Sequence, residues 1–258
     1  MPAPQLRRQR EHVPVLAPRQ GRRSCKLVRF GIAGVIGLLV LSAACGAFAQ
    51  VSGTVSVVSD YRYRGVSLSD NEPAAQLGIT YDDAQGWYAG AFVSTAESAY
   101  YQTQGVQAIG FGGYAWRLAS GLTLEAGADY SVVTTSPRYD YPEIYAGFAF
   151  QNVSGRVYYS PRYFGQDSSA VYGELNLVQP LRDDVHLVAH VGVLGSHAKN
   201  LYGAPSGPVV DGAAGVSIVW NGFNLQVSWV GVNHASAAYA VTGVGNRNGV
   251  VASLSRSF

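Results

Sequence analysis

Cysteine is almost absent from this chain, which has two in 258 residues, Cys25 and Cys45. From residue 50 to the end there is none, so disulfides, thiolate metal sites and cysteine nucleophiles are excluded from that region. A region without cysteine suits an oxidising compartment. Charged residues are also scarce, at 13% of the chain. No apolar run reaches the roughly 20 residues that a membrane-spanning helix needs. These absences exclude a disulfide-stapled domain and argue against a helical membrane anchor.

The start of the chain has the pattern of a secretory signal peptide. Residues 1–29 hold eight Lys or Arg and a single acid. An apolar run at 30–44 follows, and the small-x-small sequence at 47–49 is typical of a cleavage site. A membrane-spanning helix is the alternative for the apolar run, but the run is too short and the sequence after it is strand-like. We expect residues 1–49 to be a signal peptide with a long basic extension, and residues 50–258 to be the mature protein.

Removal of this leader reverses the sign of the net charge. The whole chain has a formal charge of +2. Residues 50–258 keep ten of the 18 Lys and Arg residues and fifteen of the 16 acids, so their formal charge is −5. Because no basic patch remains, the sequence gives no support to a nucleic-acid-binding function.

Apolar and polar residues alternate with a period of two through most of the mature region. The segment 223–229, Phe-Asn-Leu-Gln-Val-Ser-Trp, is the clearest example. A period of two places the apolar residues on one face of a β-strand and the polar residues on the other. Twelve strands are predicted in this way, at 51–64, 73–82, 86–97, 103–116, 121–133, 140–151, 155–164, 170–180, 184–194, 208–220, 222–233 and 246–258.

The connections between these segments are alternately short and long. The clearest short one is Asn221-Gly222, because Asn-Gly supports the positive φ angles of a type I′ hairpin. Outer-membrane barrels have an even number of strands, short periplasmic turns and longer extracellular loops. The sequence therefore predicts an all-β fold, a transmembrane antiparallel up-and-down β-barrel of about 12 strands in the cell outer membrane. A soluble β-sandwich, the rival fold, explains neither this alternation nor the terminal Phe258.

Aromatic residues gather at the ends of the predicted strands. Trp87, Trp116 and Trp220 flank short turns. Four tyrosines flank long connections: Tyr63, Tyr139, Tyr141 and Tyr163. Two girdles of aromatic residues, one at each membrane interface, would produce this distribution.

The carboxyl terminus suggests how the barrel is assembled. Phe258 ends the last predicted strand, and a terminal aromatic resembles the signal that the barrel assembly machinery recognises. The departure is Arg256, which stands where an aromatic is common. The expected partners are outer-membrane lipid, the barrel assembly machinery during biogenesis, and small hydrophilic solutes.

The segment Asp60-Tyr61-Arg62-Tyr63-Arg64-Gly65, with its continuation to Pro73, resembles the opening of the TorF-family porins. These are a proteobacterial family of uncharacterised outer-membrane proteins. Trp87-Tyr88-Ala89-Gly90, Tyr158-Tyr159-Ser160-Pro161 and residues 140–147 also look like this family. The resemblance implies an outer-membrane barrel of a Gram-negative bacterium. The family's transport role is a label given by analogy.

Polar residues on the strand faces opposite the apolar ones are expected to line the barrel lumen, where rings of charge would set ion preference. In the first predicted strand Asp60, Arg62 and Arg64 share a face. The other inward candidates are Glu125, Asp129, Glu143, Tyr145, Arg156, Arg162, Glu174, Asn176, His186, His190, Asn224 and Gln226.

Two functions fit this lumen. One is a porin that gives passive diffusion of small hydrophilic solutes or ions, biased by Arg62, Arg64 and the opposing acids. The other is a closed barrel with a structural or adhesive role, whose lumen is filled by long side chains and ion pairs. Because an unpaired charge would be costly, each arginine is expected to lie near an acid.

Metal and enzyme alternatives receive little support from the residues. His186 and His190 would lie about 13 Å apart on a strand, too far for one ion. No metal or cofactor is expected. His234-Ala235-Ser236, with Asn248, resembles the His-x-Ser pair and Asn of a twelve-stranded outer-membrane phospholipase, in which the His activates the Ser. No other part of that enzyme's pattern is present, so we expect the chain not to be an enzyme, and phospholipase remains a minor alternative.

Overall fold

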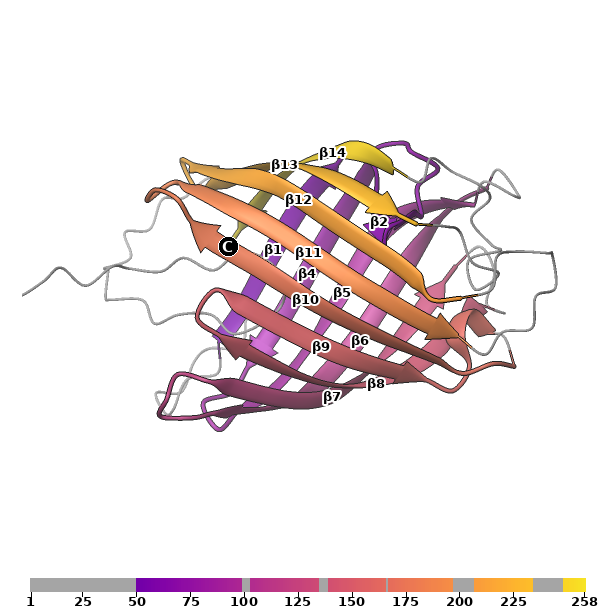
Figure 1. Ribbon diagram of the computed structural model, residues 1–258, viewed down its shortest axis with the longest axis horizontal. Coiled ribbons are helices and arrows are strands. Elements are labelled where there is room, and N and C mark those ends of the chain that lie inside the picture. The colour runs from indigo at the N-terminus through magenta and orange to yellow at the C-terminus, as the bar shows by residue number, and fades with distance from the viewer. Residues whose placement is uncertain (1–49, 99–102, 135–138, 166, 197–206, 234–247) are drawn as a thin grey trace, which may run out of the picture. The chain divides into compact units, whose positions relative to one another are not determined.

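The computed structural model describes residues 50–98, 103–134, 139–165, 167–196, 207–233 and 248–258. Twelve of its strands form one closed antiparallel barrel (Figure 1). The barrel strands are β1 (Gln50–Val58), β4 (Ala74–Asp82), β5 (Trp87–Ser98), β6 (Thr103–Arg117), β7 (Thr123–Val133), β8 (Tyr141–Phe150), β9 (Val153–Ser160), β10 (Ala170–Pro180), β11 (Val185–Ser196), β12 (Val209–Trp220), β13 (Phe223–Val232) and β14 (Asn248–Ser257).

Three short elements lie between the barrel strands. β2 (Arg62–Tyr63) and β3 (Val66–Ser67) pair with each other in a separate hairpin between β1 and β4. η2 (Tyr163–Gly165) is a single turn of 3-10 helix after β9. Across the described ranges, no helix has the length and apolar character needed to cross a bilayer.

The twelve predicted strands are all present, and the predicted all-β barrel is confirmed. Two of them end earlier than expected. The first stops at Val58 rather than at residue 64, because the polar segment after it turns into the β2–β3 hairpin. The ninth stops at Ser160, directly before Pro161, which has no N–H to continue a ladder.

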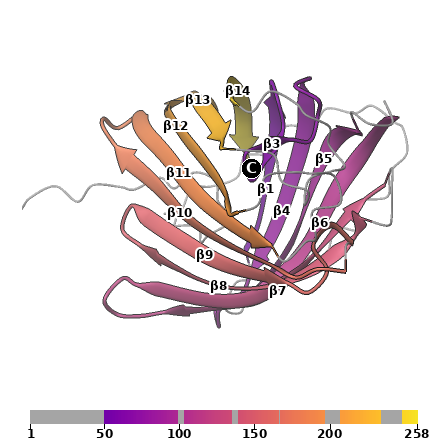
Figure 2. The same cartoon turned by 45° about the vertical axis from the view of Figure 1, so that its right-hand side comes forward.

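The barrel closes where the two ends of the sheet meet. β1 pairs with β14 through Val55 and Arg256, among others. At the end of this seam the Phe258 N–H donates to the Gly53 carbonyl at 2.9 Å, and the Gly53 N–H donates to the Phe258 carbonyl at 3.0 Å. Closure leaves no sheet edge unpaired, which a strand within a bilayer requires. Figure 2 shows the tilted strands curving round to complete the ring.

The outer face of the barrel is apolar and exposed. In β13, Val227 is 46% exposed and Trp229 is 52% exposed, whereas the intervening Ser228 is buried. The same alternation exposes Val, Leu, Ile and Trp side chains on strands all round the barrel. A soluble protein does not expose apolar surface on this scale, but a barrel whose outer face contacts hydrocarbon does. The soluble β-sandwich is therefore wrong.

The short turns lie together at one end of the barrel, as the predicted up-and-down order of strands requires. The Asn221-Gly222 turn has φ angles of 50° and 80°, which are those of the expected type I′ hairpin. Trp87, Trp116 and Trp220 are exposed at the short-turn end, in keeping with an interfacial girdle.

The predicted girdle of tyrosines at the other end is wrong. Tyr139, Tyr141 and Tyr163 are buried in one core cluster, against which Tyr63 packs. Their hydroxyl-bearing rings face inward because the β2–β3 hairpin provides a surface to pack on.

The assignment of faces predicts unequal costs for two neighbouring substitutions in β13. Val227→Arg places a charge on the lipid face near the middle of the strand, and we expect it to lower the free energy of unfolding by about 2–4 kcal/mol. Gln226→Arg places the same side chain in the lumen and should cost much less. Equilibrium urea unfolding in lipid vesicles measures both. Equal costs for the two variants would contradict the membrane-facing assignment.

Candidate functional site

The β2–β3 hairpin is folded into the barrel, and it turns at Arg64 and Gly65. These residues have φ angles of 49° and 80°, as a two-residue type I′ turn requires. Gly65 also lies against the barrel wall, since a Cβ there would come 2.6 Å from Asp211 Cβ and 3.1 Å from Val232 Cβ. A side chain at this position would push the hairpin tip off the wall.

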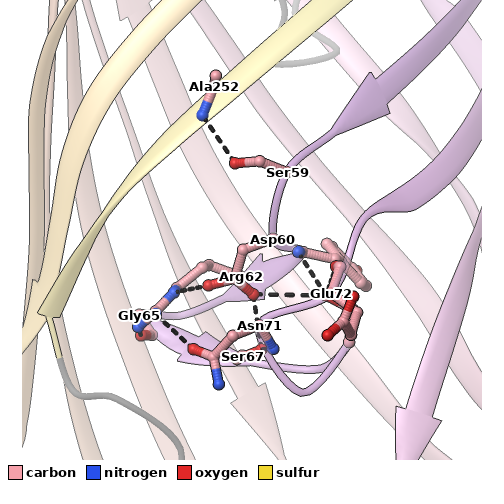
Figure 3. A network of polar contacts seen from close by, with 10 residues as sticks. Ser59, Asp60, Arg62, Gly65, Ser67, Asn71, Glu72 and Ala252 are labelled. Carbon is pink, nitrogen blue, oxygen red and sulfur yellow. Dashed lines mark hydrogen bonds and ion pairs between the residues drawn. The ribbon is translucent and has the colours of Figure 1, made fainter.

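Asp60 holds the hairpin in its compact form (Figure 3). Its carboxylate accepts hydrogen bonds from Arg62 Nε at 2.5 Å and from Ser67 Oγ at 2.6 Å. Ser59 joins the start of the hairpin to β14, where its N–H donates to the Ala252 carbonyl at 2.8 Å and its Oγ accepts from the Ala252 N–H at 3.0 Å. The prediction that Asp60, Arg62 and Arg64 share one face of a wall strand is therefore wrong, because β1 has already ended at Val58.

Contacts with strands on several sides of the barrel hold the hairpin across the lumen. The Leu68 carbonyl accepts from the Glu97 N–H of β5 at 2.8 Å. Tyr61 Oη donates to Gln107 Oε1 of β6 at 2.7 Å. Together with the Gly65 contacts on β12 and β13, these bonds make the hairpin a constriction that spans the lumen.

The hairpin tip ends in a buried ion pair. Arg64 Nη1 and Nη2 donate to the two carboxylate oxygens of Glu143 on β8, at 3.1 and 2.6 Å. The exposed fractions of these side chains are 5% and 3%. A bidentate pair of this kind is both strong and geometrically specific. It joins residues 79 positions apart in the chain.

A second buried ion pair crosses the inner wall. Arg156 of β9 donates from Nε and Nη2 to Glu125 of β7, at 2.6 and 3.0 Å. The intervening strand, β8, allows this because it has a glycine there. A Cβ at Gly147 would lie 2.7 Å from Arg156 Cγ and 2.9 Å from Glu125 Oε1.

Two more inward glycines make room for tyrosines beside this pair. Cβ atoms at Gly113 and Gly127 would lie 2.6 and 2.5 Å from the hydroxyls of Tyr88 and Tyr145. These two hydroxyls are hydrogen bonded to each other at 2.8 Å, and Tyr88 also donates to Glu125 at 2.9 Å. Small residues on one strand thus accommodate large polar side chains from its neighbours.

A cluster of hydrogen-bonded polar side chains lies on the inner face of β10, β11 and β12. His190 Nε2 is 2.8 Å from Asp211 Oδ1, and His190 Nδ1 is 2.7 Å from Asn176 Oδ1. Tyr172 Oη donates to Asp211 at 3.2 Å. His186 lies on the same strand as His190 and is buried. Within the described ranges no cluster of His, Cys, Asp and Glu suited to hold a metal ion is found.

The remaining candidates divide into inward and outward residues. Asp129 is half-buried, opposite Glu143 in the β7–β8 register. Glu174 is half-buried and accepts from Tyr158 Oη at 3.4 Å. Gln226 donates to Ser228 at 3.0 Å. Arg162 is exposed in the connection after β9, so its predicted place beside Arg156 on a strand face is wrong.

The expectation that arginines lie near acids is confirmed for three of the four lumen candidates, Arg62, Arg64 and Arg156. The prediction missed Asp211, although its alternation with Val209 in β12 places both on one face and could have revealed it. It also missed the lumen role of the buried tyrosines, which sequence position alone does not separate from interfacial ones.

Acids outnumber bases inside the described part of the barrel. The inward acids are Asp60, Glu125, Asp129, Glu143, Glu174 and Asp211. The arginines there are Arg62, Arg64 and Arg156, and His190 is the histidine that contacts an acid. The lumen therefore carries an excess of negative groups.

Comparison with protein families assigns this barrel to a family. Residues 42–258 match Gcw_chp, a family described as bacterial proteins of unknown function. The chain belongs to this family. A search of curated proteins found no match to it in sequence.

Several solved membrane proteins resemble the chain in fold. A chain from a study of in-meso crystallization of membrane proteins has a TM-score of 0.50 at 11% identity, over 80% of this chain and 83% of that one. The KdgM porin has a TM-score of 0.49 at 11% identity, over 80% and 98%. The NanC porin has a TM-score of 0.49 at 11% identity, over 81% and 99%. At such identities the likeness is one of fold. A closed twelve-stranded barrel with an apolar exterior is the architecture of an outer-membrane protein, and the chain is one.

The role of the inward glycines can be tested by substitution with alanine. Gly147→Ala should lower the free energy of unfolding by about 1–3 kcal/mol, because the new methyl group overlaps the Arg156–Glu125 pair. Gly110→Ala is the matched control, since no atom lies within 4 Å of its Cβ position. Urea unfolding in vesicles compares the two. If both variants were as stable as the native chain, the glycine would not be needed for the ion pair.

Proposed function

We propose that the chain is a narrow outer-membrane porin that gives passive diffusion of small hydrophilic solutes or ions, with the β2–β3 hairpin as its constriction. The observation that carries this proposal is a set of inward polar side chains that keep accessible surface inside the barrel. Asp129 and Glu174 on the lumen face are only half-buried, and the His190 side chain is 24% exposed. An inward acid that makes no ion pair would be costly in a dry, packed lumen, whereas a lumen that holds water solvates it.

The excess of acids supports a preference for cations. Asp129 and Glu174 are half-buried inward acids outside the ion pairs of the described residues, so they remain available to passing ions. A negative lumen lowers the electrostatic free energy of a cation and raises that of an anion. The proposed pore is therefore cation-selective, with Arg62 and Arg64 largely neutralised by their own partners.

The hairpin also favours a second candidate, a closed barrel with a structural or adhesive role. The Arg64–Glu143 pair joins the tip to β8, and Gly65 lies against β12 and β13. In that case the long loops would carry the function. Conductance separates the two candidates.

Several other parts of the proposal rest on the sequence. We infer that residues 1–49 are a signal peptide and that Phe258 is read by the barrel assembly machinery. The resemblance of Asp60–Gly65 to the TorF-family porins supports a transport role within the Gcw_chp family. Passive diffusion involves no catalysis. The His234 and Ser236 of the phospholipase alternative lie outside the described residues, and Asn248 begins β14.

The first experiment removes the constriction. Residues 60–71 are replaced by a short Gly-Ser link, together with Glu143→Gln so that no buried carboxylate is left without its cation. We expect conductance steps in planar bilayers that are several-fold larger than those of the native barrel. Arg117→Ala is the control, because the Arg117–Asp82 pair, 3.9 Å apart, is partly exposed at the short-turn end.

The outcomes of this experiment separate the candidates. Silence of both proteins would refute the porin and leave the closed barrel. A silent native barrel beside a conducting deletion would make the hairpin a complete plug, which also favours the closed barrel.

The second experiment measures selectivity. Asp129→Asn and Glu174→Gln together replace two inward carboxyl groups of the lumen with amides. We expect the reversal potential in a potassium chloride gradient to move toward zero, because the cation preference weakens. Asp183→Asn, in a short turn outside the lumen, should leave it unchanged. An unaltered reversal potential in the double variant would refute the proposed role of these acids.

A further inference from the structure

The guanidinium group of Arg64 lies within a cage of aromatic rings. Its Cζ is 4.3 to 5.2 Å from four ring centroids, all within the range of a cation–π contact. The rings are those of Tyr172 at 4.3 Å, Tyr63 at 4.9 Å, Tyr158 at 5.1 Å and Tyr163 at 5.2 Å. The two oxygens of Glu143 accept its hydrogen bonds in the same place. Rings and carboxylate together surround one planar cation.

Most of this cage belongs to the barrel and not to the hairpin. Glu143 comes from β8, Tyr158 from β9, Tyr172 from β10 and Tyr163 from η2. These rings have supports of their own. Tyr172 donates to Asp211 at 3.2 Å, and the Tyr163 ring contacts the Tyr141 ring at a centroid distance of 5.0 Å. The walls of the cage are therefore positioned without help from Arg64.

The cage requires a cation. Glu143 is almost fully buried, and a carboxylate in such a place is costly unless a positive charge pairs with it. The electron-rich faces of the tyrosine rings favour the same sign of charge. Arg64 meets this requirement from the β2–β3 hairpin and not from a wall strand.

We propose that this cage, formed by Glu143, Tyr158, Tyr163 and Tyr172, is a binding site for small solutes that carry a guanidinium group, and that Arg64 is its tethered occupant. A guanidinium is planar, donates bidentately to a carboxylate, stacks on aromatic rings and is weakly hydrated, which the cage matches at each point. A metal ion is a poor fit, because a single carboxylate supplies its only charged oxygens. The inference deepens the proposed pore function by naming a solute class.

The covalent connection of Arg64 to the barrel through the hairpin determines how the site would act. A side chain on the same polypeptide competes at an effective concentration of about the millimolar range or higher. A free guanidinium solute thus enters when Arg64 is withdrawn or when the solute is in excess. Its entry would release the hairpin tip from Glu143 and widen the constriction.

The test measures binding to the emptied cage. The full barrel with Arg64→Ala is refolded in detergent and titrated with methylguanidinium chloride, and its melting temperature is followed by tryptophan fluorescence. At about ten times the dissociation constant the expected rise is about 3–6 °C, since binding then contributes about 1.4 kcal/mol. The native barrel, in which Arg64 competes for the cage, should show a much smaller rise at the same concentration.

Matched controls define the recognition. Arg64→Ala combined with Glu143→Gln keeps the rings and removes the carboxylate, so its melting temperature should not respond. Potassium and tetramethylammonium chloride at equal concentration should have no effect on Arg64→Ala. A rise in the double variant, or an equal rise with tetramethylammonium, would overturn recognition by a bidentate carboxylate. Absence of any rise in Arg64→Ala would overturn the site.

Two further readouts keep the result decisive. If Arg64→Ala fails to refold alone, its refolding yield is measured with and without methylguanidinium, and restoration of the yield by this cation alone is expected. Failure of this rescue counts against the site. The melting assay needs no conductance. A positive shift with silent bilayers would refute only the pore, and a conducting barrel without a shift would refute only the guanidinium site.

Discussion

Hydrocarbon contacts the whole outer face of this barrel, and the rest of the structure follows from that constraint. Lipid offers no hydrogen bonds, so every backbone N–H and C=O in the wall must be paired within the sheet. The seam between β1 and β14 completes this pairing. Apolar residues are then most stable outside, and polar residues are driven into the lumen. This distribution of apolar residues outside and polar residues inside is the reverse of that in a soluble protein.

Polar side chains within a ring of twelve strands have to find partners across it. Inward glycines on one strand leave the space in which long polar side chains from the neighbouring strands meet. Gly147 leaves room above β8 for Arg156 to reach Glu125. Inward glycines on β6 and β7 similarly accept the tyrosine hydroxyls that border this pair. The abundance of glycine in the chain thus has a packing role as well as a role in turns.

The β2–β3 hairpin places charge where no wall strand could. A strand residue reaches inward only by the length of its side chain, whereas the hairpin carries Arg64 across the lumen to Glu143. The constriction and the proposed binding site share one group, because the Arg64 guanidinium that holds the hairpin tip on Glu143 also fills the aromatic cage. A solute that competes for the cage therefore acts on the constriction as well.

The local pattern of the chain was enough to predict the architecture. Alternation with a period of two located all twelve strands, and Asn221-Gly222 was identified as a type I′ turn, because each depends on neighbouring residues alone. The strand at 103–116 has a weak pattern because its inward positions include the apolar Ile109 and Phe111, while Gly110 and Gly112 stand on the outward face. Alternation therefore located the strand without revealing its faces.

The candidate site was only partly within reach of the sequence. Glu125, Glu143 and Arg156 could be assigned to the lumen by alternation, because a wall strand fixes the side to which each side chain points. Sequence determined which residues are polar and which strand face each occupies. Tertiary structure alone decided that Arg64 leaves the wall and meets Glu143, and that Tyr141 and Tyr163 face inward. These contacts join residues far apart in the chain, and their energies depend on the closed ring, which no local pattern specifies.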